Sequence, residues 1–110
     1  MSSIEKNNEN FVHVVLFWLK NPNDEADKEA FKKHVQTLLE TSKHAKNKHL
    51  GVPAQTARFV VESSYTFCLK VTFDNLADHD KYQVEAAHKL FISEAAYLWE
   101  KVLIIDSEVF

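Results

Sequence analysis

Apolar positions along this chain follow two different periods, and the changes between them divide it into successive elements. Phe11–Lys20 is dense in β-branched and aromatic residues and is apolar at both odd and even positions. This pattern predicts a strand that is covered on both faces. From Asp24 to about Ser42 the apolar residues recur at helical spacing after an acidic first turn, which predicts an amphipathic helix.

Two further strands are predicted in the middle of the chain. Ala57–Glu62 and Tyr65–Phe73 are rich in strand-forming residues, and only Ser63 and Ser64 separate them. This arrangement is typical of a hairpin. The basic segment Lys43–His49 that precedes it is short and has no interleaved aromatic residues, so it is predicted to be a solvated helix end and loop.

The last third of the chain predicts a second helix and a fourth strand. Helical spacing returns from Leu76 to about Trp99, and Val102–Val109 is a final β-rich run. The apolar stripe of this helix is Val84, His88, Phe91, Ala95 and Leu98. The resulting order, βαββαβ, is that of a ferredoxin-like α+β fold, a four-stranded antiparallel sheet with both helices on one face.

Such a sheet leaves one face without helices, although the first and last strands are apolar on both sides. Exposing that face would create a larger apolar patch than single-chain proteins usually tolerate. We therefore predict a homodimer in which two sheets pack face to face about a two-fold axis.

Composition limits the possible classes of protein. The 110 residues, 45% of them hydrophobic, suit one domain at 11–110 after a polar, flexible leader at 1–10. The longest apolar run, Val14–Leu19, is far shorter than the about 20 residues of a membrane span. A single cysteine, Cys68, fits a reducing cytoplasm. A net charge of −3 with Arg58 as the only arginine argues against a nucleic-acid partner.

Four segments, in this order, resemble the stress-responsive A/B barrel domain (Dabb) family. They are Phe11–Lys20, Ser64–Phe67, Tyr82–Phe91 and Trp99–Asp106, and the resemblance extends from residue 11 to the end of the chain. It implies a homodimeric α+β barrel. Many members of this family have no assigned reaction and some are linked to stress or defence. One plant relative is a polyketide cyclase that closes a ring by aldol condensation without a cofactor.

The resemblance also implies site residues. Two residues central to the cyclase correspond to Tyr82 and His88, and its pocket histidine in the first strand corresponds to His13. A pocket tyrosine of its first helix is replaced here by His34, which departs from a polyketide pocket. The family pattern His-Pro-x-His reads Glu85-Ala86-Ala87-His88. Since residues six apart lie about 120° apart around a continuous helix, Tyr82 and His88 converge only if the helix kinks.

Each candidate has a structural interpretation beside the functional one. His88 is either a hydrogen-bonded core histidine or a general base. Tyr82 either fills the seam between helix and sheet or polarises a substrate carbonyl. His13 lies on an apolar face, as a satisfied core residue or a pocket floor, and His34 lies at a helix edge or on the pocket rim. The remaining predicted ligand contacts are Phe17, Phe67, Phe91 and Trp99.

Metal and cofactor binding are not predicted. The three inward histidines could supply imidazoles, but no His-x-His or His-x3-His spacing supports a metal site, and neither haem nor another cofactor is expected. Cys68 has no neighbouring base and is not expected to act as a nucleophile. The other histidines are predicted to be exposed: His44, His49 and His79.

Three functions remain open. The first is a dimeric module that binds a small apolar or carbonyl-containing molecule in a His/Tyr-lined pocket. The second is a cofactor-independent enzyme on an enolisable carbonyl compound, with His88 as the base and Tyr82 as the electrophile. The third is a purely structural, oligomeric stress protein with a closed core.

Overall fold

The computed structural model describes residues 9–110, and the leader predicted for residues 1–10 lies outside the described residues apart from its last two positions. Four strands form one sheet in the spatial order β2-β3-β1-β4, and all neighbouring strands are antiparallel. Their bounds are Phe11–Leu19 for β1, Lys46–Gly51 for β2, Phe67–Phe73 for β3 and Trp99–Glu108 for β4.

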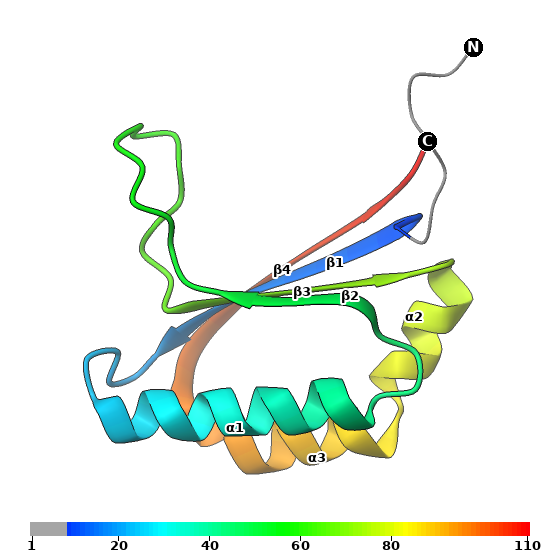
Figure 1. The fold of residues 1–110 in the computed structure, drawn as a ribbon, viewed down its shortest axis with the longest axis horizontal. Coiled ribbons are helices and arrows are strands. Elements are labelled where there is room, and N and C mark those ends of the chain that lie inside the picture. Colours follow the sequence, from blue (N-terminus) through cyan, green and yellow to red (C-terminus); the bar gives the residue numbers. More distant parts are fainter. Residues whose placement is uncertain (1–8) are drawn as a thin grey trace.

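The helices leave one face of this sheet free. α1 and α3 run side by side beneath the sheet, and α2 stands at the end of β3 (Figure 1). The bounds are Glu25–Thr41 for α1, Leu76–Gln83 for α2 and Ala86–Ala95 for α3, and a 3-10 turn, Ala96–Leu98, leads into β4. The predicted ferredoxin-like α+β fold is thereby confirmed. None of the helices formed by residues 9–110 has the length and apolar character needed to cross a bilayer.

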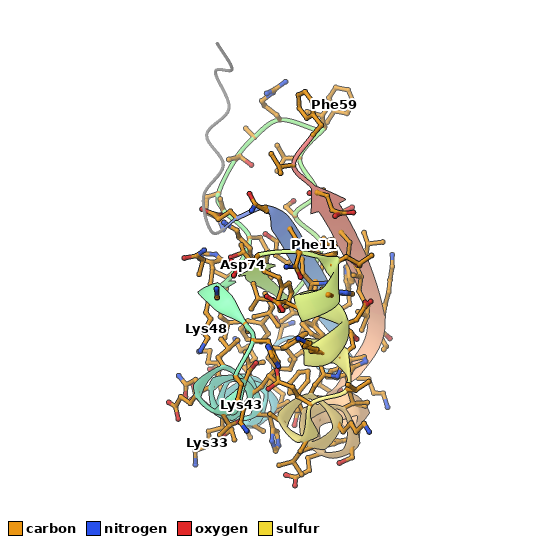
Figure 2. All side chains as sticks on the ribbon, turned by 90° about the vertical axis from the view of Figure 1, so that its right-hand side faces the viewer. Phe11, Lys33, Lys43, Lys48, Phe59 and Asp74 are labelled. Carbon is orange, nitrogen blue, oxygen red and sulfur yellow. The ribbon has the colours of Figure 1, made fainter. Side chains whose placement is uncertain are left out.

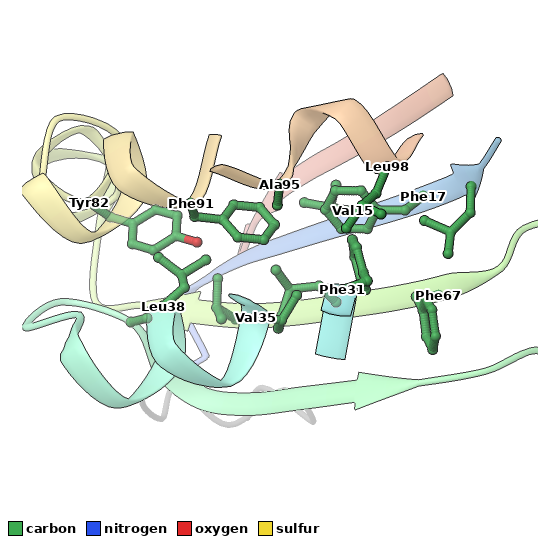
Figure 3. Packing of buried hydrophobic residues seen from close by; sticks show 14 of the residues in the cluster. Val15, Phe17, Phe31, Val35, Leu38, Phe67, Tyr82, Phe91, Ala95 and Leu98 are labelled. Atoms are coloured by element: carbon green, nitrogen blue, oxygen red, sulfur yellow. The ribbon is translucent and has the colours of Figure 1, made fainter. Parts of the chain in front are cut away.

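Phe31 of α1 lies at the centre of the core between helices and sheet. Its ring stacks on Phe67 at a centroid distance of 4.8 Å and meets Phe17 edge-on, also at 4.8 Å. Figure 3 shows this packing. Every second residue of β1 points into the same layer and is buried: Phe11, His13, Val15, Phe17 and Leu19. This packing holds β1 and the helices together as the walls of the site described below.

The other face of the sheet is apolar and uncovered in the single chain. Its β1 side chains are Val12, Val14, Leu16 and Trp18. In the antiparallel register, Leu103 and Ile105 of β4 lie beside this row, 43% and 52% exposed. The prediction that β1 is apolar on both faces is therefore confirmed.

The strand predicted at Ala57–Glu62 is wrong, because the edge strand β2 is Lys46–Gly51, inside the segment predicted to be loop. β2 is polar, and its pairing with β3 is interrupted by a register shift beside Asn47, whose φ is 47°. Asparagine tolerates this left-handed conformation. Lysines and bulges are common on edge strands because they discourage further strand pairing, so an apolar pattern does not reveal such a strand.

Residues 52–66 form a long connection between β2 and β3, in place of the predicted two-residue turn. The apolar run that suggested a strand lies within it, and Phe59 at its centre is 99% exposed. Figure 2 shows Phe59 at the opposite end of the molecule from Lys33 of α1. This apolar run therefore does not pair with the sheet, although its residues favour strands.

The helix predicted from Leu76 to Trp99 is interrupted, and Trp99 is the first residue of β4. The chain leaves the helical conformation at Val84 and Glu85, where ψ of Glu85 is 145°. The Glu85 carboxylate accepts hydrogen bonds from Ser42 Oγ at 2.7 Å and from the Lys43 backbone N–H at 2.8 Å. A contact with the end of α1 thus stabilises the break that proline usually supplies in this sequence pattern.

Because the helix is interrupted, the predicted apolar stripe is wrong at its first residue. Val84, expected to point inward, is 64% exposed because it lies at the turn between α2 and α3. The later members of the stripe, Phe91, Ala95 and Leu98, are buried as expected. Of the histidines predicted to be exposed, His49 is exposed, whereas His44 and His79 are half-buried.

Replacing Glu85 by alanine is expected to lower the free energy of unfolding by about 1.5–3 kcal/mol, the usual range for hydrogen bonds to a charged group. Urea denaturation followed by circular dichroism measures this change. Glu40→Ala, an exposed position on α1, is the matched control and should shift stability by less than about 0.5 kcal/mol. Equal midpoints for the two variants would contradict the role given to Glu85.

Candidate functional site

A cavity of about 250 Å³ lies between the sheet and helices α2 and α3. Most of its wall is apolar, and the polar groups at it are His13, Tyr82, Gln83 and His88. The apolar lining residues are Val15, Phe17, Leu69, Phe91, Ile92, Trp99, Val102 and Ile104. A concave apolar site with a few converging polar groups is the usual form of a small-molecule site.

The break between α2 and α3 brings Tyr82 and His88 together. Their ring centroids are 5.0 Å apart, and Tyr82 lies 6.0 Å from His13 on β1. In a continuous helix the two residues would point in different directions. The arrangement therefore depends on the Glu85 contact, since that contact is what holds the chain in its non-helical conformation.

His13 is oriented by an acidic partner on β4. Because a carboxylate only accepts hydrogen bonds, the Nδ1–H of His13 donates to Asp106 Oδ1, at 2.5 Å. Burial lowers the pKa of His13, and the hydrogen bond and negative charge of Asp106 oppose this effect without cancelling it. Near neutral pH the ring is therefore uncharged, and its Nε2 is the nitrogen that can accept a proton.

The other two titratable groups at the cavity, Tyr82 and His88, are also uncharged near neutral pH. Burial lowers the pKa of His88, and the nearby His13 lowers it further. Burial, with a smaller contribution from the negative charge of Glu85, raises the pKa of the Tyr82 hydroxyl, so this group remains a hydrogen-bond donor. The site thus combines neutral imidazoles, which can accept protons, with a phenol that can donate a hydrogen bond to a developing negative charge.

Two of the predicted site residues lie elsewhere. His34 faces a different depression between α1 and α3, where its Nδ1 is 3.9 Å from Glu94 Oε2. Phe67 is buried in the core against Phe31 rather than at the cavity. The other predicted contacts, Phe17, Phe91 and Trp99, do line the cavity together with the three polar residues His13, Tyr82 and His88.

Two residues at the end of the cavity were not among the predicted site residues. Asp106 could have been found from strand alternation, since it shares a face of β4 with the cavity residues Val102 and Ile104. His79 gives no such signal. It lies on α2, stacks on Phe11 at 4.7 Å, and its Nε2 is 3.7 Å from Asp106 Oδ2. Donor atoms of His13, His79 and Asp106 all lie within 4.8 Å of one another.

Comparison with known families gives one assignment. A sequence profile of the stress responsive A/B barrel domain family, Dabb, matches residues 11–109. A search of curated proteins gives no match to this chain.

Similar solved structures share the fold at low sequence identity. A Dabb family protein with a ferredoxin-like fold from Mesorhizobium loti has a TM-score of 0.76 and 19% identity, covering 91% of this chain and 96% of its own. A dimeric ferredoxin-like protein of unknown function from Thermobifida fusca has a TM-score of 0.75 and 15% identity over 99% of both chains. A hydroxynitrile lyase from Passiflora edulis has a TM-score of 0.74 and 17% identity, covering 94% of this chain and 96% of its own.

Proposed function

Because this chain belongs to the stress responsive A/B barrel domain family, in which the fold alone does not define an activity, we propose a function from the cavity itself: it binds a small, largely apolar organic molecule that carries a carbonyl group. The observation behind this proposal is the meeting of His13, Tyr82 and His88 at one end of an otherwise apolar wall. The cavity, at about 250 Å³, lies just below the common range of about 300–1,000 Å³. It therefore suits a molecule the size of a single substituted ring.

Ligand binding can be tested with phenylacetone, which has an apolar ring and an enolisable ketone. We expect its titration into isotope-labelled protein to shift the amide resonances of cavity residues. Ile92→Trp should weaken binding at least tenfold, about 1.4 kcal/mol, because the indole would occupy the cavity next to Phe91. Leu90→Trp, two positions earlier on α3 and outside this cavity, is the matched control and should bind normally.

Each outcome of this titration decides between the functions left open by the sequence. Shifts confined to the cavity and lost in Ile92→Trp support the binding module. Shifts that are equal in both variants place the ketone elsewhere and contradict the proposal. The absence of any saturable shift favours a purely structural role for this domain.

A second candidate function, enolisation of a bound ketone, is favoured by the hydrogen bond between His13 and Asp106. Nε2 of His13 takes a proton from the carbon next to the carbonyl, and the C–H electron pair forms the carbon–carbon double bond of an enolate. The Tyr82 hydroxyl donates a hydrogen bond to the enolate oxygen, and Asp106 stabilises the imidazolium. Return of the proton to carbon completes the cycle without a cofactor.

This assignment moves the base from His88, favoured by the sequence, to His13. Within residues 9–110 no hydrogen bond orients the imidazole of His88, whereas Asp106 holds His13 in one tautomer. His88 then serves as a second hydrogen-bonding group beside Tyr82. The Passiflora edulis neighbour is named a hydroxynitrile lyase, which supports proton-transfer chemistry as compatible with this fold.

We also propose that two copies of the chain pack through the uncovered sheet face. The exposed apolar row of β1 and β4, with Ile105 52% exposed, is the support from this chain. The Thermobifida fusca neighbour is described as dimeric. A two-fold contact of this kind would bury the same row from both copies.

A further inference from the structure

Three electron-pair donors from three different elements converge beside the cavity. His13 comes from β1, His79 from α2 and Asp106 from β4. One ligand atom of each lies within 4.8 Å of the other two. Asp106 is central to the group, because one carboxylate oxygen contacts His13 Nδ1 at 2.5 Å and the other lies 3.7 Å from His79 Nε2.

The orientation of His79 makes this group more than a chance cluster. Its other ring nitrogen, Nδ1, lies 3.1 Å from Asp80 Oδ1 and donates its proton to that carboxylate. Nε2 then carries a lone pair, which accepts a hydrogen bond from the side-chain amide of Gln83 at 3.3 Å and lies 3.7 Å from Asp106 Oδ2. An ion at Nε2 would therefore replace a neutral donor, the Gln83 amide at the end of the same helix.

Metal-binding histidines commonly have this arrangement. The nitrogen that does not bind the ion donates its proton to a carboxylate or carbonyl, which fixes the tautomer and the ring orientation. Asp80 does this for His79, and the stacking of His79 on Phe11 at 4.7 Å restricts the ring further. Asp80 is thus a positioning residue rather than a ligand.

We propose that His13, His79 and Asp106 form a binding site for a divalent transition-metal ion of the zinc type. Two imidazoles and one carboxylate are donors that zinc accepts, and three protein ligands leave a fourth position open in its usual tetrahedral geometry. Ligand atoms must approach by a small rearrangement, which the partly exposed Asp106 allows. The ion takes the place of the Nδ1 proton of His13, and that proton moves to Nε2 of the same ring, so His13 binds as a neutral imidazole.

The sequence predicts no metal because spacing rules search for ligands that are close along the chain. Here the ligands are separated by 66 and 27 positions, 79 − 13 and 106 − 79. The trio considered from the sequence, His13, His34 and His88, is not the one that converges, because His34 faces Glu94 in another depression. Only the sheet register and the position of α2 bring His79 and Asp106 to His13.

The test is a titration of the metal-free protein with Zn²⁺ alone, followed by competition with a chromophoric chelator and by isothermal calorimetry in buffers of different ionisation enthalpy. We expect one ion per chain with little proton release near neutral pH, since His13 is already uncharged there. His79→Phe keeps a ring against Phe11 but has no donor nitrogen, and it should bind at least about 100-fold more weakly, since loss of an outer partner alone costs about 10–100-fold. Co²⁺ should give the visible absorption of tetrahedral coordination in the natural sequence and not in His79→Phe.

Two further variants keep the proposal falsifiable. Asp80→Asn changes an exposed side chain and should weaken Zn²⁺ binding by about 10–100-fold without unfolding the protein. His49→Phe, at an exposed histidine of β2, should bind Zn²⁺ like the natural sequence. If His79→Phe and His49→Phe bind equally, the ion binds to exposed histidines and the proposed site is wrong.

Zinc binding and ketone binding can fail separately. His79 does not line the cavity, so His79→Phe should lose Zn²⁺ while the phenylacetone titration is unchanged. Conversely, Ile92→Trp should block the ketone and leave Zn²⁺ binding intact, because Ile92 lies on α3, which supplies none of the three donors. The metal site therefore does not rest on the proposed function.

Discussion

Substitution of His13 by alanine is expected to slow the exchange of the α-hydrogens of phenylacetone for deuterium by about 100-fold or more, the usual contribution of a general base. The imidazole is the only group at the cavity whose tautomer is fixed by a carboxylate within residues 9–110. Proton magnetic resonance in deuterium oxide measures the exchange directly. A chelator in all samples keeps metal ions from affecting the result.

Asp106→Asn tests the contribution of the Asp106 charge separately from the contribution of His13 as the base. An amide cannot stabilise the imidazolium as a carboxylate does, so exchange should slow while the apolar wall of the cavity still binds the ketone. His34→Ala is the matched control, because this histidine faces Glu94 and lies outside the cavity. Equal exchange rates in His13→Ala and His34→Ala would exclude His13 as the base, and a loss confined to His88→Ala would return that role to His88.

Four of the six predicted elements lie where the sequence pattern puts them. β1 and β3 are recognisable because their core-facing positions are almost all apolar, and α1 because an amphipathic stripe follows the Asp24 N-cap. β4 begins three residues earlier than expected, at Trp99 instead of Val102. In each case the local pattern and the final environment agree, which is the condition under which sequence reasoning succeeds.

Besides the interrupted helix, the sequence pattern misplaces the edge strand, and the missed strand and the false strand have opposite physical causes. β2 is missed because it lies at the edge of the sheet, where pairing with β3 rather than burial of side chains stabilises it. The false strand at Ala57–Glu62 is an apolar run that remains in a connection. The residues of a segment alone therefore do not decide whether it becomes the edge strand. That depends on which part of the chain after α1 pairs with β3.

The candidate site shows a similar division. His13, Tyr82 and His88 were found from their residue types, their apolar surroundings and the family resemblance, and they do share a cavity. That Tyr82 and His88 meet could not be predicted from Ala86 and Ala87, which favour helix. The break is stabilised by hydrogen bonds from the end of α1 to Glu85, a contact between residues more than forty positions apart in sequence.

A carboxylate placed on the uncovered sheet face should separate the proposed dimer. Val14 lies in the central strand β1, between Lys70 of β3 and Ile105 of β4. In Val14→Glu, the two-fold contact would remove a carboxylate of each copy from water. This desolvation costs several kcal/mol, and Lys70, which already pairs with Glu9, offsets it only in part. Light scattering at micromolar concentration should therefore change from twice the chain mass to the chain mass of 12.7 kDa.

The single chain should tolerate this substitution, which makes the result specific to association. Val14 is only half-buried in the monomer, and Lys70 lies directly opposite, so a glutamate there keeps contact with water and gains a cationic neighbour. Val84→Glu is the matched control, because Val84 is exposed at the turn between α2 and α3, away from the sheet. A natural sequence that already scatters as a 12.7 kDa species would contradict the dimer, and a Val14→Glu variant that stays dimeric would require a contact that excludes the centre of this face.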